Sequence, residues 1–427
     1  MTSGVLAAIG AAVFAWGVLS ARLQRADLTA PIVFVVLGVA LSAAISAEGA
    51  EAESLKVLAE TTLVWVLFSD AARVGVRELR SDAGLYVRLL AVALPITAVA
   101  GWLSAWALFG GLGLWLALFV GAALAPTDAA LGAVVITHPA VPVRIRRVLN
   151  VESGLNDGII TPVVLVALAG AASEHGDGGG AVHALIQLTL GVVIGVVVGG
   201  AGGGILRTAR RRGWVDGAFA GPAVLALALV CYTLAVTIDA NGFIAAFVGG
   251  IAFGHVAGRG HPAAVGYVEQ TAGLTSLLVW LLVGAVAVPV ILDHLSWQVL
   301  LYAVLSLTVM RMVPVAATLV GAGLKRPAVL FVGWFGPRGL ASVVFALLAI
   351  EELGDAAGAA VAVVVTTVLL SVVAHGLTAS PLAERFGAHM ATDGATATDS
   401  ATPRHTSRLG RPVPGEPRHP EAAHGER

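Results

Sequence analysis

Four polar residues lie close together in an otherwise apolar stretch: Glu152, Ser153, Asn156 and Asp157. In a helix, residues four apart share a face, so Glu152 lies beside Asn156, and Ser153 beside Asp157. At 1.5 Å per residue, Asp157 comes roughly 12 Å after the start of the apolar segment at residue 149. If this segment spans a membrane, that depth is near the middle of a hydrocarbon layer about 30 Å thick. Ionisable groups are costly there, so these residues are candidates for a functional site.

Two motifs that contain proline and glycine interrupt other apolar segments. The first is Ala125-Pro126-Thr127-Asp128 and the second is Gly336-Pro337-Arg338-Gly339. Proline lacks a backbone donor and clashes with the preceding turn, while glycine lowers the cost of unwinding a helix. In a membrane, the freed backbone groups are tolerated only where they are buried in protein or face a water-filled cavity. Both motifs therefore predict helices that break at a binding site.

Two arginines, Arg311 and Arg338, are predicted to lie in the membrane together with these carboxylates. A buried carboxylate is stable when it binds a proton or a cation, or when it pairs with an arginine. We expect Glu152 to pair with an arginine, either Arg311 or Arg338. Asp157 has no cation in its own segment, so we expect it to be the exchanging group. Asp128 could ligate a cation or could cap the half-helix that follows the first break.

The elements that position these residues are predicted to be transmembrane helices. Of 427 residues, 58% are hydrophobic and only 12% are charged, and the mean hydropathy is +0.90. A water-soluble domain cannot bury that much apolar surface. Apolar stretches of about 20 residues predict an all-α polytopic membrane protein with about 13 transmembrane helices. The expected spans are 4–20, 31–47, 56–72, 86–108, 113–135, 149–171, 183–206, 217–238, 242–257, 271–292, 297–322, 328–350 and 357–382.

The positions of the two breaks, in the fifth and twelfth spans, predict an internal repeat. Because the offset of seven is odd, the two broken helices run in opposite directions across the membrane. We therefore expect inverted repeats, with spans 1–6 forming one unit, spans 8–13 the other and span 7 connecting them.

The charges of the loops predict the orientation of the spans. Alternate loops, beginning with Arg22 and Arg25, are basic, and the loops between them are mainly acidic. Cytoplasmic loops carry the basic excess, so we expect a multi-pass protein of the inner (plasma) membrane with its N-terminus outside. Residues 1–382 form the predicted transmembrane domain, and residues 383–427 have no apolar period and are predicted to be a disordered cytoplasmic tail. We expect His375 to be an interfacial histidine near the cytoplasmic end of its span.

At these motifs the chain resembles the sodium/proton exchangers of the NhaP and NHE type, which are monovalent cation:proton antiporters. The resemblance covers the whole membrane part, residues 1 to about 385. The matching elements are Ala125–Asp128, Val151–Asp157, Arg311, Gly336–Ser342 and His375-Gly376-Leu377-Thr378 followed by Pro381-Leu382. The resemblance implies a homodimer with a dimerisation domain and a six-helix transport core of spans 4–6 and 11–13, with the two broken helices crossing at its centre, in the middle of the membrane. It also implies that Asp157 binds cation and proton in turn, and that Thr127, Asp128 and Ser153 supply oxygen ligands to Na⁺. For the arginine that pairs with Glu152, Arg311 is the first choice and Arg338 the second.

The resemblance also implies a stoichiometry. An asparagine at position 156 goes with one-for-one electroneutral exchange, whereas electrogenic relatives carry two adjacent aspartates there. A single titrating carboxylate holds either one proton or one monovalent cation, which agrees with that stoichiometry. The predicted activity is electroneutral antiport of Na⁺, with Li⁺ or K⁺ as alternatives, against H⁺ by alternating access. Val151 and Gly154 depart from the family pattern, but neither change removes a ligand.

Three other functions fit parts of the sequence. A K⁺/H⁺ antiporter of the same fold would differ only in the geometry around Asp157. An intramembrane aspartyl protease could use Asp128 and Asp157 as a carboxylate pair, but it would leave Asn156 and the second break unexplained. A channel would need a continuous pore. We therefore expect a secondary active transporter rather than an enzyme, surrounded by membrane lipid, with no cofactor, nucleic acid or soluble partner beyond the transported ions.

Overall fold

The computed structural model describes residues 3–24, 26, 28–47, 52–74, 82–174, 180–258, 261–288, 291 and 294–399. Within these residues all regular elements are helices, which confirms the all-α class. Eight helices in this described part are long and apolar enough to cross a membrane, and three shorter apolar helices accompany them. The chain is therefore a multi-pass membrane protein.

Each predicted span coincides with one helix or with consecutive helices. In the first part of the chain these are α1 (Ser3–Gln24), α2 (Ala30–Ala47), α3 (Ala52–Arg73), α5 (Ala83–Tyr86), η1 (Val87–Ala93), α6 (Leu94–Leu108), α7 (Leu114–Ala123), α8 (Ala133–Thr137) and α9 (Val143–Glu174). In the second part they are α10 (Gly180–Arg211), α11 (Gly217–Thr237), α12 (Gly242–Val256), α13 (His261–Leu282), η2 (Val283–Ala287), α15 (Trp297–Leu307), α16 (Val309–Thr318), α17 (Arg326–Trp334), α18 (Leu340–Leu353), η3 (Gly354–Ala357) and α19 (Gly358–Asp399).

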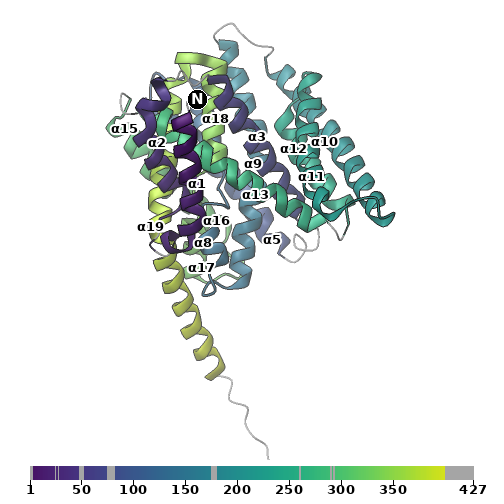
Figure 1. Ribbon diagram of the computed structural model, residues 1–427. Coiled ribbons are helices and arrows are strands. Elements are labelled where there is room, and N and C mark those ends of the chain that lie inside the picture. Colours follow the sequence, from purple (N-terminus) through teal and green to yellow (C-terminus); the bar gives the residue numbers. More distant parts are fainter. Residues whose placement is uncertain are drawn as a thin grey trace, which may run out of the picture. The chain divides into compact units, whose positions relative to one another are not determined.

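The helices α10 and α12 pack with their backbones in close contact (Figure 1). Glycines recur at every fourth position of α10, and a Cβ atom at Gly199 would overlap backbone atoms of Gly249 on α12. On its other side α12 packs against α3, where Gly250 lies on the backbone of Phe68. Helices in lipid associate largely through close packing of this kind. The helices α3, α10 and α12 therefore form one tightly packed group.

Both predicted breaks are present. Helix α7 ends at Ala123 and α8 begins at Ala133, while α17 ends at Trp334 and α18 begins at Leu340. The backbone N–H of Asp128 donates to the carbonyl of Pro337 over 2.8 Å, so the two broken helices meet as expected. The inverted-repeat relation between the two halves, and the total of 13 spans, stay predictions.

Helix α9 is longer than the predicted span. It begins at Val143 rather than at residue 149 and continues through Pro162 to Glu174. Asp157 thus lies about 21 Å along the helix rather than roughly 12 Å, at 1.5 Å per residue. It is still near the middle, with 14 residues before it and 17 after it.

The predicted tail also differs from the structure at its start. Helix α19 does not end at residue 382 but continues to Asp399. The extension is stabilised by burial of Ala383 and Phe386, and the Phe386 ring stacks on Phe331 of α17 with 4.2 Å between centroids. The rest of the predicted tail, residues 400–427, lies outside the described residues, as does Arg25.

Candidate functional site

The carboxylate of Asp128 joins the two breaks. Its Oδ1 atom accepts hydrogen bonds from the backbone N–H groups of Ala130 and Leu131, at 2.7 and 3.2 Å. Its Oδ2 atom accepts from Leu340 N, the first residue of α18, at 2.9 Å. Free N–H groups at a helix N-terminus favour such an acceptor, and a negative charge there is stabilising. In its own break, Asp128 therefore bonds the turn that precedes α8, and not the start of α8 itself. The half-helix that it caps is α18 of the other break, whereas the sequence hypothesis placed the cap on the half-helix after its own break.

This cap depends on a glycine in the second motif. A Cβ atom built at Gly339 would overlap the carboxyl group of Asp128. Only a residue without a side chain lets the carboxylate reach Leu340 N.

Three of the predicted site residues form one buried hydrogen-bonded cluster. The Thr127 hydroxyl lies 2.9 Å from the Ser153 hydroxyl, and it accepts a hydrogen bond of 2.7 Å from Asn156 Nδ2. Thr127 comes from the first break, whereas Ser153 and Asn156 are on α9. The cluster therefore fixes the first break against the helix that carries Asp157.

Asp157 faces a cavity of about 460 Å³. It is 8% exposed, and no described residue donates a hydrogen bond to its carboxylate in this structure. Asp128 and Asp70 line the same cavity, so three carboxylates share it. Carboxylates so close together repel each other, which favours binding of a proton or a cation among them.

Asp70 is the site residue that the sequence reading missed. It lies on α3, and a Cβ atom at Gly154 of α9 would be 3.7 Å from the Asp70 Cβ. The rule that singled out Asp157, an acid within an apolar span, also applies to Asp70. It lies near the end of its span, three residues before Arg73, and only the packing of α3 on α9 brings it to the site.

The two predicted arginines have different partners. Arg311 Nη2 lies 2.6 Å from Glu152 Oε1, and both side chains are buried. Arg338 donates instead to backbone carbonyls, at 3.2 Å each for Ala125, Pro126 and Gly336. Arg311, the first choice, is therefore the cation beside Glu152, and Arg338 satisfies carbonyl groups that the breaks leave free.

One end of the large cavity is marked by an ion pair between Arg73 of α3 and Glu269 of α13. Both side chains are exposed, and Asn150 at the early part of α9 also lines this region. Arg73 belongs to the basic loops that the sequence predicts to be cytoplasmic. In this structure, Asp157 therefore faces a cavity that leads toward the predicted cytoplasmic side.

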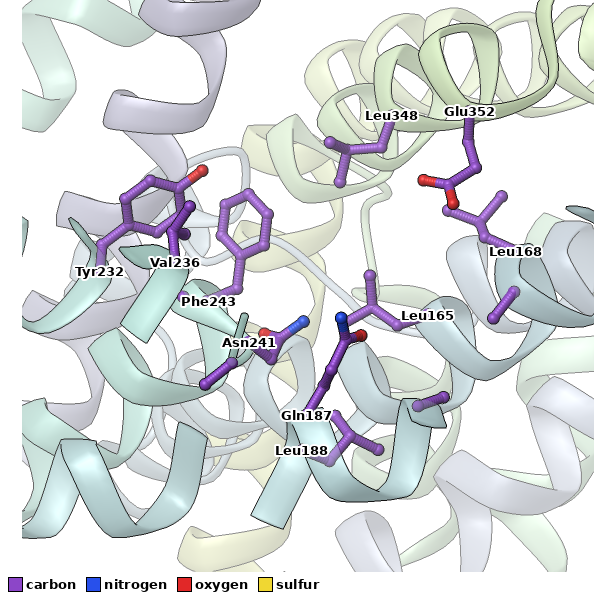
Figure 2. Close-up of a pocket in the computed structure, with 14 residues that line it drawn as sticks. Leu165, Leu168, Gln187, Leu188, Tyr232, Val236, Asn241, Phe243, Leu348 and Glu352 are labelled. Carbon is purple, nitrogen blue, oxygen red and sulfur yellow. The ribbon is translucent and has the colours of Figure 1, made fainter. Parts of the chain in front are cut away.

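A second cavity of about 200 Å³ lies farther along α9, beside Leu165 and Leu168 (Figure 2). Figure 2 shows the amide groups of Gln187 and Asn241 and the carboxylate of Glu352 directed into it. Leu165 comes two turns after Asp157, and Asp157 is not part of the lining. Helix α9 therefore borders one cavity on each side of its central carboxylate.

This arrangement can be compared with known proteins. The family model described as "Sodium/hydrogen exchanger, transmembrane" matches residues 8–385, which is most of the chain. The chain belongs to the sodium/hydrogen exchanger family. The match ends close to residue 385, where the sequence motifs also end.

Two antiporters are about a quarter identical to this exchanger-family chain over the aligned residues. It is 25% identical over 299 residues to a K(+)/H(+) antiporter NhaP of Alkalimonas amylolytica, covering 68% of this chain and 50% of that protein. It is 26% identical over 294 residues to a Na(+)/H(+) antiporter of Schizosaccharomyces pombe, covering 61% of this chain and 60% of that one. The chain thus spans about half to three-fifths of the length of these relatives.

The fold of the exchanger-family chain is similar to a solved structure of the sodium proton antiporter MjNhaP1 from Methanocaldococcus jannaschii at pH 8. The TM-score is 0.71 at 18% identity, and the match covers 90% of this chain and 98% of the other. At that identity the likeness establishes a shared fold.

Proposed function

We propose that this protein is a secondary active transporter that exchanges one monovalent cation, Na⁺ in the first place, for one proton across the plasma membrane. The observation that carries the proposal is the environment of Asp157. Its carboxylate is buried, receives no hydrogen bond from a described residue, and faces a cavity shared with Asp70 and Asp128. Such a carboxylate is stable with either a proton or a cation bound, which is the requirement for exchange.

The proposed cation site is built from oxygen atoms, which hard cations prefer. Asp157 is the main ligand, and Thr127, Ser153 and Asp128 supply further oxygens. Both Asp128 oxygens accept backbone hydrogen bonds, but a carboxylate has about four lone-pair sites, so it can also face an ion. Asn156 orients the Thr127 hydroxyl through its 2.7 Å hydrogen bond. Asp70 adds a third negative charge to the cavity wall.

The charges at the site support one-for-one exchange. Glu152 is neutralised by Arg311, Asn156 is uncharged, and Asp128 is occupied as a helix cap. In the proposed cycle Asp157 carries one proton in one direction and one cation in the other. Each crossing then moves the same charge, so the exchange is electroneutral.

Alternating access is the proposed way in which Asp157 reaches both sides. The cavities on the two sides of α9 are the proposed entry and exit paths. The motion carries the broken helices and α9 past the packed group of α3, α10 and α12. We further propose a homodimer in the plasma membrane, with the N-terminus outside and the C-terminus in the cytoplasm.

Antiport of K⁺ against H⁺ is a second candidate. It is favoured by the similarity to the K(+)/H(+) antiporter NhaP of Alkalimonas amylolytica. The same site serves both candidates, so the responding cation decides between them.

The test uses inside-out vesicles from cells that lack their own antiporters. Respiration acidifies the vesicle interior, and a pH-sensitive dye then reports proton efflux when Na⁺, Li⁺ or K⁺ is added. We expect efflux with the wild type, background signal with Asp157→Asn, and wild-type signal with the matched control Asp239→Asn, an exposed aspartate outside the cavity. An imposed membrane voltage should leave the initial rate unchanged.

Three results would refute parts of the proposal. If the well-expressed wild type shows no efflux with any cation, the proposed exchange function is wrong. If Asp157→Asn exchanges like the wild type, the assignment of the site to Asp157 is wrong. Cation flux that is not coupled to protons would indicate a channel instead.

A further inference from the structure

The second helix break leaves backbone polar groups that need partners. Helix α17 ends at Trp334 and α18 begins at Leu340, so several backbone groups between them lie outside the helical hydrogen-bond pattern. Asp128 provides partners for Pro337 O and Leu340 N. On the other side, a different helix bonds Arg338 N and also contacts Trp334 O, which in addition accepts from Gly336 N over 2.7 Å.

That helix is α19, which presents Ser371, His375 and Thr378 to the break. These residues are spaced at i, i+4 and i+7, so they lie on one face. Ser371 Oγ accepts from Arg338 N over 2.7 Å, and His375 Nε2 lies 2.9 Å from Trp334 O. The Trp334 ring stacks on the His375 ring, with 5.0 Å between centroids, and its Nε1 donates to Thr378 Oγ1 over 3.1 Å. His375 is 2% exposed, so it is a buried residue rather than the interfacial one expected from the sequence.

The donors and acceptors in this group define the state of the histidine. Ser371 Oγ already accepts from Arg338 N, so its own hydrogen is free to point at His375 Nδ1, 3.1 Å away. Nδ1 also lies 2.9 Å from the Ser371 carbonyl, so Ser371 presents both a donor and an acceptor to this nitrogen. Nε2 faces only the acceptor Trp334 O, so the neutral ring bonds both sides when its hydrogen lies on Nε2 and Nδ1 accepts from the Ser371 hydroxyl. The opposite neutral tautomer would leave Nε2 without a hydrogen toward that carbonyl. A doubly protonated ring would add a positive charge near Arg338 and Arg311.

We propose that Ser371 and His375, supported by Thr378, are positioning residues for the exchange reaction. They connect the two sides of the second break through one chain of hydrogen bonds, from Arg338 N–H to Ser371, then to neutral His375, then to Trp334 O. The chain fixes the start of α18, where Leu340 bonds to Asp128 and lines the cavity that Asp157 faces. This inference rests on the proposed function, because the reaction it serves is the exchange at Asp157.

The transport test compares full-length variants in proteoliposomes. His375→Ala and Ser371→Ala are expected to raise the cation concentration for half-maximal exchange by about tenfold, with a smaller change in maximal rate. His375→Gln is expected to restore most of the affinity, because its amide can accept from Ser371 and donate to Trp334 O. The matched control is Thr367→Val, since the Thr367 hydroxyl is buried on the same helix but bonds only to Val363 O.

A second measurement tests the hydrogen bonds without relying on transport. Solid-state NMR of protein labelled with ¹⁵N-histidine reports the tautomer of each ring, and His375→Gln identifies the signal among the 11 histidines. We expect hydrogen on Nε2 and a hydrogen-bonded, bare Nδ1. Ser371→Ala should shift the Nδ1 signal, and Thr367→Val should leave it unchanged.

The outcomes separate this inference from the proposed function. If the wild type exchanges no cation, the function fails, while the NMR result still decides whether the hydrogen-bond chain exists. If the wild type exchanges and His375→Ala matches Thr367→Val in affinity, the positioning role is wrong. A doubly protonated His375, or an Nδ1 signal insensitive to Ser371→Ala, would overturn the chain itself.

Discussion

Glu152 and Asp157 lie five residues apart on α9 but have opposite electrostatic surroundings. Glu152 contacts the Arg311 guanidinium at 2.6 Å, whereas Asp157 faces a cavity with two other carboxylates. Among the described residues, Arg311 Nε and Nη1 and Glu152 Oε2 have no hydrogen-bond partner. A buried pair with such incomplete hydrogen bonding contributes little net stability, although the loss of one partner is costly. In the proposed site, the pair therefore neutralises a carboxylate that would otherwise compete with Asp157 for the cation.

A double-variant experiment tests this structural role. Arg311→Met leaves an uncompensated buried carboxylate, so we expect the free energy of unfolding to fall by about 3–5 kcal/mol. Combining it with Glu152→Gln should recover most of that loss and should retain cation-dependent proton efflux. Thermal unfolding in detergent measures the first effect, and the vesicle assay measures the second. A stable double variant without efflux would mean that the pair takes part in transport.

The sequence predicted which carboxylates lie at the site better than it predicted the side chains that they contact. Asp157 could be separated from Glu152 because it has no cation in its own segment, but only the family resemblance ranked Arg311 above Arg338 as the partner of Glu152. The choice depends on where α16 places Arg311, after an interruption at Thr308 between α15 and α16 that contains neither proline nor glycine. Asp70 was missed and His375 was misplaced for a similar reason, because helices distant in sequence bring Asp70 to the cavity and His375 to the second break.

Helix breaks are the elements that organise the site. Each break leaves polar backbone groups, and each group described above is bonded by the opposite break, by Arg338 or by α19. The breaks were predictable because proline and glycine act on the local backbone, whatever the tertiary packing around them. The early start of α9 was not predictable from hydropathy, since its first turns contain Arg144, Arg146 and Arg147. The extension of α19 depends on the contact between Phe386 and Phe331, which is a tertiary effect.

The close approach of Gly339 to Asp128 gives a prediction about the second break. Gly339→Ala would push the Asp128 carboxylate away from Leu340 N. We therefore expect the free energy of unfolding to fall by about 1–3 kcal/mol and the rate of cation-dependent proton efflux to fall as well. Gly333→Ala is the matched control, because its Cβ atom would only contact Met312 at 3.6 Å. Thermal unfolding and the vesicle assay compare the two variants. Equal behaviour of both would show that the glycine in the break is not required for the cap.

At the scale of the whole molecule, the two cavities beside α9 predict accessibility from opposite faces. The chain contains one cysteine, Cys231, which is fully buried, so the wild type provides an unreactive background. We expect Ser276→Cys, in the large cavity, to react with an impermeant thiol reagent added to the cytoplasmic face. Gln187→Cys, in the second cavity, should react from the outside. Mass spectrometry of vesicles of both orientations measures the labelling.

The pattern of labelling also tests the orientation. Reaction of both variants from the same face would contradict the assignment of the cavities to opposite sides. Labelling of each from the face opposite to the one expected would reverse the predicted topology while preserving two-sided access.

The hydrogen bond between Asp128 N and Pro337 O has a consequence for biosynthesis. The ribosome reaches Pro337 about 200 residues after Asp128, which at roughly 5–20 residues per second takes about 10–40 s. During that interval the first break has no partner for its polar backbone, and lipid cannot supply one. The polar backbone of the first break must therefore contact water or another protein, such as the insertion machinery, until the second broken helix has been synthesised and packs against it. The proposed ion site and the completed membrane insertion of the chain are thus formed by the same late event.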